Sequence, residues 1–349
     1  MSRAQMIPTI LNPAKERIAE IDDFTSFIWT PRFYASGDFE LCADIARLPF
    51  LVPGNYVMRK NDNRAGIIEK IQVTRSEEKQ EMVVASGRML PSILSRRIIS
   101  TQTQISGLVT ASIEQLIIEN AINPSNAARK IANLSFANNS ASTAQIDAQY
   151  TGQELLATVS GLCESNSIGM DCTFDDDYNF VFSLYDGVDR SYGQSVNPYV
   201  VFSDQYDNLL NSEYIEDYTN YATDVLVGGE GEGINRTMVW SAKNSQSGLS
   251  RYEKFLDASS AVSNDNIITQ ETYEKQLEGL GLEQVTEYTT AFSGEVDFSG
   301  VELGVDINIG DICTIENARW GMYINSRLIE VIESIGEDGA YSAVPTFGT

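Results

Sequence analysis

Apolar and polar residues alternate with a period of two through much of the first hundred positions, which is the pattern of strands that bury one face. Residues 24–32 are rich in aromatic and β-branched side chains, which suit a half-buried sheet surface. Residues 67–74 place Ile71 and Val73 on one face, and after a polar connection residues 82–85 are apolar again. The pattern predicts a strand at 24–32 and a hairpin formed by 67–74 and 82–85.

The period changes to that of an α-helix in the middle of the chain. Ser112 and Gln115 have the spacing of a capping box, and apolar residues then recur at helical spacing until Pro124, which forbids continuation. Thr151 begins a second capping box, followed by another apolar helical pattern. Strand-like alternation returns around a turn at 175–177. We therefore expect a small α/β part with two helices here.

The last third is again mostly strand-like. Residues 270–277 predict one helix, stopped at Gly279. Residues 327–335 and 341–346 flank a turn of glycines and acidic residues, which predicts a terminal hairpin. The expected fold class is α+β and mostly β. The expected division is an N-terminal β part at 1–105, an α/β insertion at 106–195, and a second β-rich part with one helix at 196–349.

The chain is strongly acidic. Its 49 acidic and 24 basic residues give a formal net charge of −25. Binding DNA requires Lys and Arg to neutralise phosphates, so this charge excludes a protein that binds nucleic acid through its surface at large. A passage through which DNA moves without being held is compatible with it. The acidic triplet at 175–177 lacks the glycine and the distal glutamate of an EF-hand, and we interpret it as a solvated hairpin tip.

No histidine is present among the 349 residues. Ser-His-Asp and Cys-His catalytic sites are therefore excluded, and a zinc site would need thiolates and carboxylates alone. The four cysteines lie far apart without a C-x-x-C pair, and we interpret them as small buried apolar residues. We expect no catalytic residue, no cofactor and no metal.

Membrane segments are not indicated either. No apolar stretch approaches the roughly 18 residues that a spanning helix needs. The N-terminus has neither the apolar core nor the small-residue cleavage site of a signal peptide. We expect a chain without a membrane span that is made in a cytoplasm.

A glycine-rich run interrupts the strand pattern of the last third. Its glycines are Gly228, Gly229, Gly231 and Gly233. A phosphate-binding loop would continue with Lys and then Ser or Thr, whereas Ile and Asn follow here, and the spacing of a dinucleotide-binding turn fails as well. The run is interpreted as a sharp structural turn, where a strand at 223–227 crosses to a neighbouring subdomain.

Blocks along nearly the whole chain share one further likeness. They are SFIWTPRFYASGDFEL at 26–41, Ser86-Gly87-Arg88 with residues 94–99, residues 201–210, the glycine run with Arg236, Arg251-Tyr252-Glu253, Gly310-Asp311, Arg327-Leu328-Ile329 and residues 345–348. In this order they resemble the hub proteins at the baseplate or tail tip of long-tailed bacteriophages.

The resemblance implies tail-tube-like β-barrel subdomains with a small α/β insertion, arranged as a homotrimer in which two barrels per chain imitate a six-fold ring. Such a hub closes or adapts the tail tube to the tip complex and surrounds the DNA channel without binding DNA specifically. Its implied partners are tail-tube proteins, distal tail or baseplate proteins, and a tip or spike protein. The implied location is the virion, at the phage tail tip, after synthesis in the bacterial host cytoplasm. The resemblance supplies no catalytic residue.

Two other functions stay open. A cell-wall-degrading glycosidase needs two carboxylates, which can always be nominated in so acidic a chain. A carbohydrate- or receptor-binding tail protein would use some of the 16 tyrosines and 3 tryptophans as stacking platforms, but these are spread along the sequence.

Three acidic residues are candidates for the wall of a DNA channel. Glu295, Asp297 and Glu302 lie in a strand-like run of a segment with a large acidic excess. Carboxylates that face a lumen would repel phosphate and let DNA slide. Solubility alone is the alternative explanation for the same charge.

Overall fold

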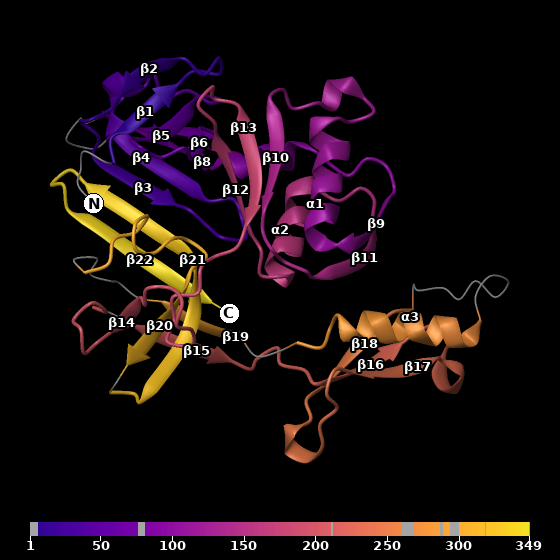
Figure 1. Ribbon diagram of the computed structural model, residues 1–349. Coiled ribbons are helices and arrows are strands. Elements are labelled where there is room, and N and C mark those ends of the chain that lie inside the picture. The colour runs from indigo at the N-terminus through magenta and orange to yellow at the C-terminus, as the bar shows by residue number, and fades with distance from the viewer. Residues whose placement is uncertain are drawn as a thin grey trace. The chain divides into compact units, whose positions relative to one another are not determined.

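The computed structural model describes residues 6–75, 81–210, 212–259, 269–286, 289–293, 300–317 and 319–348. The chain forms two compact units (Figure 1). Unit 1 consists of Met1–Glu213 and Phe292–Thr349, and unit 2 consists of Tyr214–Ala291. None of the described helices is both long enough and apolar enough to cross a membrane.

The largest sheet brings the two ends of the sequence together. Its strands, in spatial order, are β15 (Glu213–Asp217), β19 (Thr289–Ser293), β22 (Tyr341–Gly348), β21 (Met322–Gly336), β3 (Ser26–Thr30), β4 (Asp38–Asp44), β8 (Glu81–Arg88) and β7 (Lys70–Arg75), with β20 (Ile312–Asn317) beside β21 and β14 (Val201–Ser203) beside β20. Strand β21 pairs antiparallel with β3, so that Glu333 lies opposite Trp29. Sheet pairing therefore joins segments that the sequence analysis assigned to the first and the third part.

A second sheet of unit 1 shares one hydrophobic core with the largest sheet. It contains β2 (Arg17–Glu20), β1 (Pro8–Leu11), β5 (Tyr56–Arg59) and β6 (Ala65–Ile67), in that order. The shared core includes Ile10, Phe27, Trp29, Leu41, Val57, Val83 and Ile335, each at most 1% exposed. Two 3-10 helices, Ile45–Arg47 and Leu90–Arg96, follow strands of this region.

The middle of the chain forms a small α/β part. Strands β10 (Leu134–Asn139), β13 (Phe180–Tyr185) and β12 (Gly169–Phe174) make one sheet, and β9 (Thr103–Leu108) pairs with β11 (Gln145–Tyr150). Helix α1 (Val109–Ile117), continued by a π-helical turn at Ile118–Ile122, and helix α2 (Leu155–Ser165) are the two helices of this part (Figure 1). Their apolar side chains are buried in its hydrophobic core. A short 3-10 helix lies at Ala127–Arg129.

Unit 2 is a three-stranded sheet with one helix. The strand order is β17 (Met238–Ala242), β16 (Asp224–Gly228) and β18 (Glu253–Asp257), and α3 is Gln270–Leu282. Short 3-10 turns at Gly233–Asn235 and Gly248–Ser250 lie in the connections between strands. Helix α3 covers one face of the sheet, where Val225, Val227, Tyr273 and Leu277 are at most 1% exposed.

The predicted fold class is confirmed, because the structure is mostly β with a small α/β part. In the residues that the structure describes, however, the sheets do not close into a barrel. The hairpins are confirmed: β7 pairs with β8, β12 with β13, and β21 with β22. The boundaries at 105 and 195 stay a prediction.

The predicted starts of α1 and α2 and the predicted end of α3 are wrong. Helix α1 begins at Val109, so Ser112 lies inside the helix and is 3% exposed instead of capping it. Helix α2 begins at Leu155, directly after Glu154. Helix α3 runs past Gly279 to Leu282. A Cβ on Gly281 would lie 2.2 Å from the Ser241 hydroxyl, so this glycine permits close packing on β17 and does not end the helix.

Candidate interaction surface

The glycine-rich run connects two neighbouring strands of unit 2. Strand β16 ends at Gly228, which lies opposite Met238 in the antiparallel pair with β17. Gly231 and Gly233 have φ values of +102° and +56°, in the left-handed region that favours glycine. The run therefore turns the chain back within one sheet and does not lead to another subdomain. Its importance for assembly stays a prediction.

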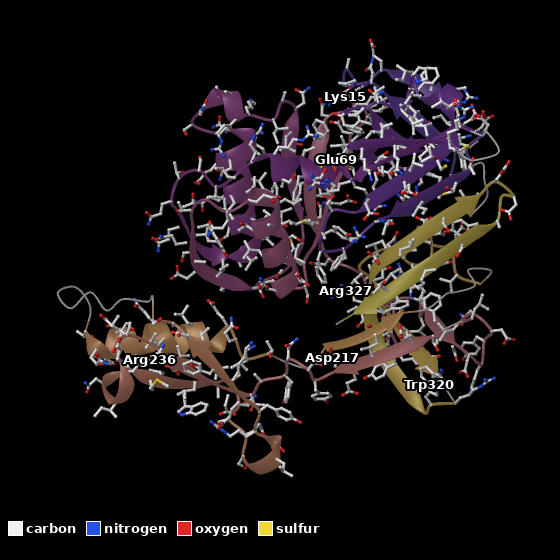
Figure 2. The ribbon with its side chains drawn as sticks, turned by 180° about the vertical axis from the view of Figure 1, so that it is seen from behind. Lys15, Glu69, Asp217, Arg236, Trp320 and Arg327 are labelled. Carbon is white, nitrogen blue, oxygen red and sulfur yellow. The ribbon has the colours of Figure 1, made fainter. Side chains whose placement is uncertain are left out.

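Two side chains of unit 2 form hydrogen bonds with the backbone of this run. The Arg236 side chain (Figure 2) donates from Nε to the Gly229 carbonyl at 3.0 Å and from Nη2 to the Gly228 carbonyl at 2.8 Å. The amide of Glu230 donates to the Tyr273 hydroxyl at 2.7 Å. A Cβ on Gly228 or Gly229 would lie within 2.6 Å of Arg236 or Tyr273. The run is thus built around these two side chains, whereas a phosphate-binding loop offers free amides.

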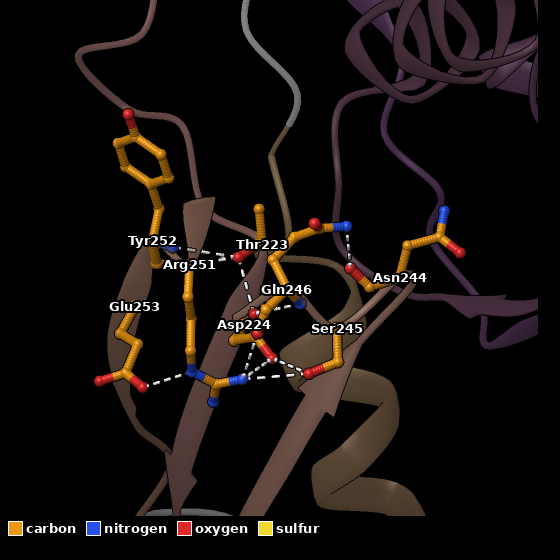
Figure 3. Close-up of polar contacts among 8 residues, drawn as sticks. All are labelled: Thr223, Asp224, Asn244, Ser245, Gln246, Arg251, Tyr252 and Glu253. Carbon is orange, nitrogen blue, oxygen red and sulfur yellow. Dashed lines mark hydrogen bonds and ion pairs between the residues drawn. The ribbon is translucent and has the colours of Figure 1, made fainter. Parts of the chain in front are cut away.

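A buried carboxylate anchors the other end of the sheet (Figure 3). Asp224 is 2% exposed and accepts hydrogen bonds from the hydroxyls of Thr223 and Ser245, both at 2.7 Å. Arg251 forms an ion pair with it and another with Glu253 at 2.5 Å. Burial alone would raise the pKa of Asp224, but the two hydroxyls and the Arg251 guanidinium hold it below its usual value.

The sheet face opposite α3 carries an exposed row of apolar side chains. Leu226 lies opposite Trp240 on one side and opposite Phe255 on the other. We call Trp240, Leu226 and Phe255 the aromatic row. Because side chains alternate along a strand, burial of Val225 and Val227 under α3 directs these three to the other face. Trp240 and Phe255 are 47% and 52% exposed.

Arg251 and Arg236 lie over the two rings of this row. The Arg251 guanidinium is 4.7 Å from the ring centroid of Trp240, and that of Arg236 is 5.6 Å from the ring centroid of Phe255. Arg236 also forms an ion pair with Asp257 at 2.5 Å. Cation–π contacts combined with ion pairs fix the positions of both rings.

The aromatic row is not evident from the sequence pattern. Residues 238–240 are all apolar, so the period of two does not reveal which face is covered. The sequence signal that could have indicated the row is an arginine shortly before a strand that carries an aromatic residue. Arg236 precedes β17 with Trp240, and Arg251 precedes β18 with Phe255. Both arginines were named above only for their likeness to a family.

The acidic channel candidates are only partly described. Glu295 and Asp297 lie outside the described residues. Glu302 lines a hollow of about 320 Å³ in unit 1, together with Arg59, Lys60 and Arg64. Glu302 therefore shares this hollow with three basic residues of its own chain. That any of the three faces a lumen stays a prediction.

Metal-binding groups and reactive thiols were sought in the described part of the chain's structure. No group of three or more Cys, Asp or Glu within it is arranged to hold a metal ion. Burial raises the pKa of the Cys163 thiol to about 12 and also raises the pKa of Cys172 and Cys313. These thiols are protonated at neutral pH and are poor nucleophiles.

Three solved structures with a similar fold are described as tail proteins. A tail protein from Neisseria meningitidis MC58 has a TM-score of 0.58 and 13% identity, covering 98% of this chain and 96% of that one. The 43 kDa tail protein of prophage MuSo2 from Shewanella oneidensis has a TM-score of 0.58 and 12% identity, covering 98% of both chains. Prophage tail protein gp18 from Listeria monocytogenes EGD-e has a TM-score of 0.55 and 11% identity, covering 98% and 94%. At sequence identities this low, the structural likeness shows a shared fold alone.

No curated protein matches the sequence. A family model described as "Siphovirus ReqiPepy6 Gp37-like protein" matches residues 7–349. The resemblance to a phage tail-associated family, stated from the sequence, is thereby confirmed. The chain belongs to the family of Siphovirus ReqiPepy6 Gp37-like proteins.

Proposed function

We propose that the chain is a structural virion protein, the hub at the tail tip or baseplate, which adapts the tail tube to the tip complex and surrounds the DNA channel. One observation carries the proposal: family and fold both match from end to end. The family model covers residues 7–349, and the likeness to the MuSo2 tail protein covers 98% of each chain. Such coverage supports the role of a tail protein for nearly all of these residues.

The proposed assembly is a homotrimer in the virion. A closed ring is how one type of chain surrounds a channel, and a ring of three chains shares the three-fold symmetry of a six-fold tube. The proposed partners are tail-tube proteins, distal tail or baseplate proteins, and a tip or spike protein. The net charge of −25 supports a channel that DNA crosses without being held.

We further propose that the chain is not an enzyme. The lack of histidine removes the usual general base and zinc ligand, and burial keeps three thiols protonated. A glycosidase would need two carboxylates that flank a sugar cleft. A peptidoglycan-release assay tests this alternative, and saturable release of soluble fragments by the purified chain would contradict the structural role.

One observation favours a second candidate, a carbohydrate- or receptor-binding role. The structure brings Trp240 and Phe255 together on an exposed face, although the aromatic residues are spread along the sequence. Sugars, however, stack on free ring faces, and guanidinium groups lie over both rings. We therefore prefer a protein contact for this face. Binding of the chain to a glycan array would reverse that preference.

The oligomeric state tests the hub proposal. Sedimentation analysis of the purified chain, alone and after addition of tail-tube protein, should show a trimer in at least the second case. A monomer or dimer that persists with tube protein present would contradict it.

A further inference from the structure

The exposed face of the unit 2 sheet has the composition of a protein–protein contact. In addition to the half-exposed rings of the aromatic row, Met238 is 45% exposed. Ile234 and Leu249 are fully exposed in the two connections, which lie at opposite ends of the strands. Aromatic residues, Met and Arg are the types enriched at interfaces, and a contiguous exposed patch of them marks an interaction site.

The row is held in place before any partner binds. Arg236 is fixed by two backbone carbonyls and Asp257, and Arg251 by Asp224 and Glu253. Since each guanidinium also lies over a ring, Trp240 and Phe255 lose little freedom on binding. Such preorganisation lowers the entropic cost of association.

The charge of unit 2 determines which kind of partner fits this face. Unit 2 contains thirteen acidic and five basic residues. On this face Arg236 pairs with Asp257, and Arg251 pairs with both Glu253 and Asp224, so that three carboxylates exceed two guanidinium groups. The side chains of Glu253 and Asp257 remain 54% and 59% exposed despite these pairs, and Glu232 is also exposed. A rim of this sign attracts Lys and Arg. It repels DNA, an anionic membrane and a second copy of the same face.

We propose that the aromatic row is the docking surface for a different polypeptide of the tail, one that presents an apolar side chain flanked by Lys or Arg. The proposal rests on the proposed function, because it takes the partner from the particle that contains this chain. The rings form the buried centre of the contact, and the carboxylates form its charged rim.

Hydroxyl-radical footprinting of the intact particle tests the docking surface. The oxidation rates of Trp240 and Phe255 are compared between the isolated chain and purified particles. Burial at the centre of an interface should slow both by about fivefold or more. Trp29, which is fully buried in the chain, serves as the internal reference and should oxidise slowly in both samples. Equal oxidation of Trp240 in the two samples would overturn the proposal.

Photo-crosslinking from position 255 identifies the occupant. A photoreactive phenylalanine at this position should link the chain, within particles, to a different polypeptide, at a segment with an apolar residue next to Lys or Arg. A link to a second copy of this chain, or to a segment without basic residues, would overturn the proposal. Footprinting needs no variant, so the proposal stays testable if the modified chain misfolds.

The two proposals fail in different ways. If the chain is absent from purified particles, the proposed function fails. If it is present but Trp240 oxidises as fast as in the isolated chain, only the docking surface fails.

Discussion

The Arg251 guanidinium lies over the exposed ring of Trp240, 4.7 Å from its centroid, while it pairs with the buried carboxylate of Asp224. The same cation thus ties the interior of unit 2 to its exposed face. Loss of the carboxylate should therefore disturb both the stability of the unit and the position of the ring.

Stability of unit 2 should depend on Asp224 in acid. Because the folded state lowers the pKa of this carboxyl below its usual 3.8, its contribution is present above that value and is lost as the pH falls through the folded-state pKa. Asp224→Asn should lower the melting temperature at pH 7 by about 5 °C or more and flatten its dependence on pH below about 4. Thermal unfolding at intervals from pH 7 down to pH 2.5 measures this. An unchanged acid slope in the variant would contradict the role assigned to Asp224.

The glycine-rich run should tolerate no side chain at its most constrained position. In Gly231→Val, a Cβ would meet the Asn235 carbonyl at 2.5 Å, at a φ of +102° that β-branched residues avoid. We expect a loss of about 2 kcal/mol or more, measured by denaturant unfolding. Gly279→Ala is the control: this exposed helical glycine has nothing within 4 Å of its Cβ position and should gain up to about 1 kcal/mol. Saturable binding of ATP or NAD to the native chain would contradict the interpretation of the run as a turn.

The N-terminal and C-terminal strands of unit 1 should depend on one buried ion pair. Glu333 is fully buried and accepts from Arg59 Nη1 at 2.7 Å and from the Tyr341 hydroxyl at 3.0 Å. Glu333→Ala leaves Arg59 paired with Asp62 alone and removes the acceptor of the Tyr341 hydroxyl, so it should cost about 2–3 kcal/mol.

The matched control for that change is Glu330→Ala on the same strand. Glu330 is 22% exposed, and its partner Arg32 keeps a second ion pair with Asp38. We expect a loss of about 1 kcal/mol or less from chemical denaturation of this variant. Equal losses in the two variants would show that the buried pair has no special role.

The hairpins could be predicted from the sequence. The alternation of apolar and polar residues in each strand and the turn residues between the strands lie within a few positions of one another. The pairing of β21 with β3 could not be predicted in this way, since Glu333 and Trp29 are about 300 residues apart in sequence. Helix starts were misplaced because Ser112 matched a capping box by spacing alone, while its side chain is buried in the helix. The aromatic row was missed because residues 238–240 of β17 are all apolar, and only the position of α3 decides which face is exposed.

The acidic channel wall remains open to a direct test. Replacing Glu295, Asp297 and Glu302 together with Lys should leave assembly intact and slow DNA ejection, because cations would hold the phosphates. At low salt the Debye length is longest and the effect should be largest. Ejection kinetics at low salt equal to those of the unmodified particle would leave solubility as the explanation of the acidic excess.

The position of the chain in the particle tests the central claim most directly. Electron micrographs of particles labelled on this chain should place the label at the tail tip, on the axis of the tail tube. A label along the tail shaft or on the capsid, or its absence from purified particles, would contradict the assignment of the chain as a tail-tip hub.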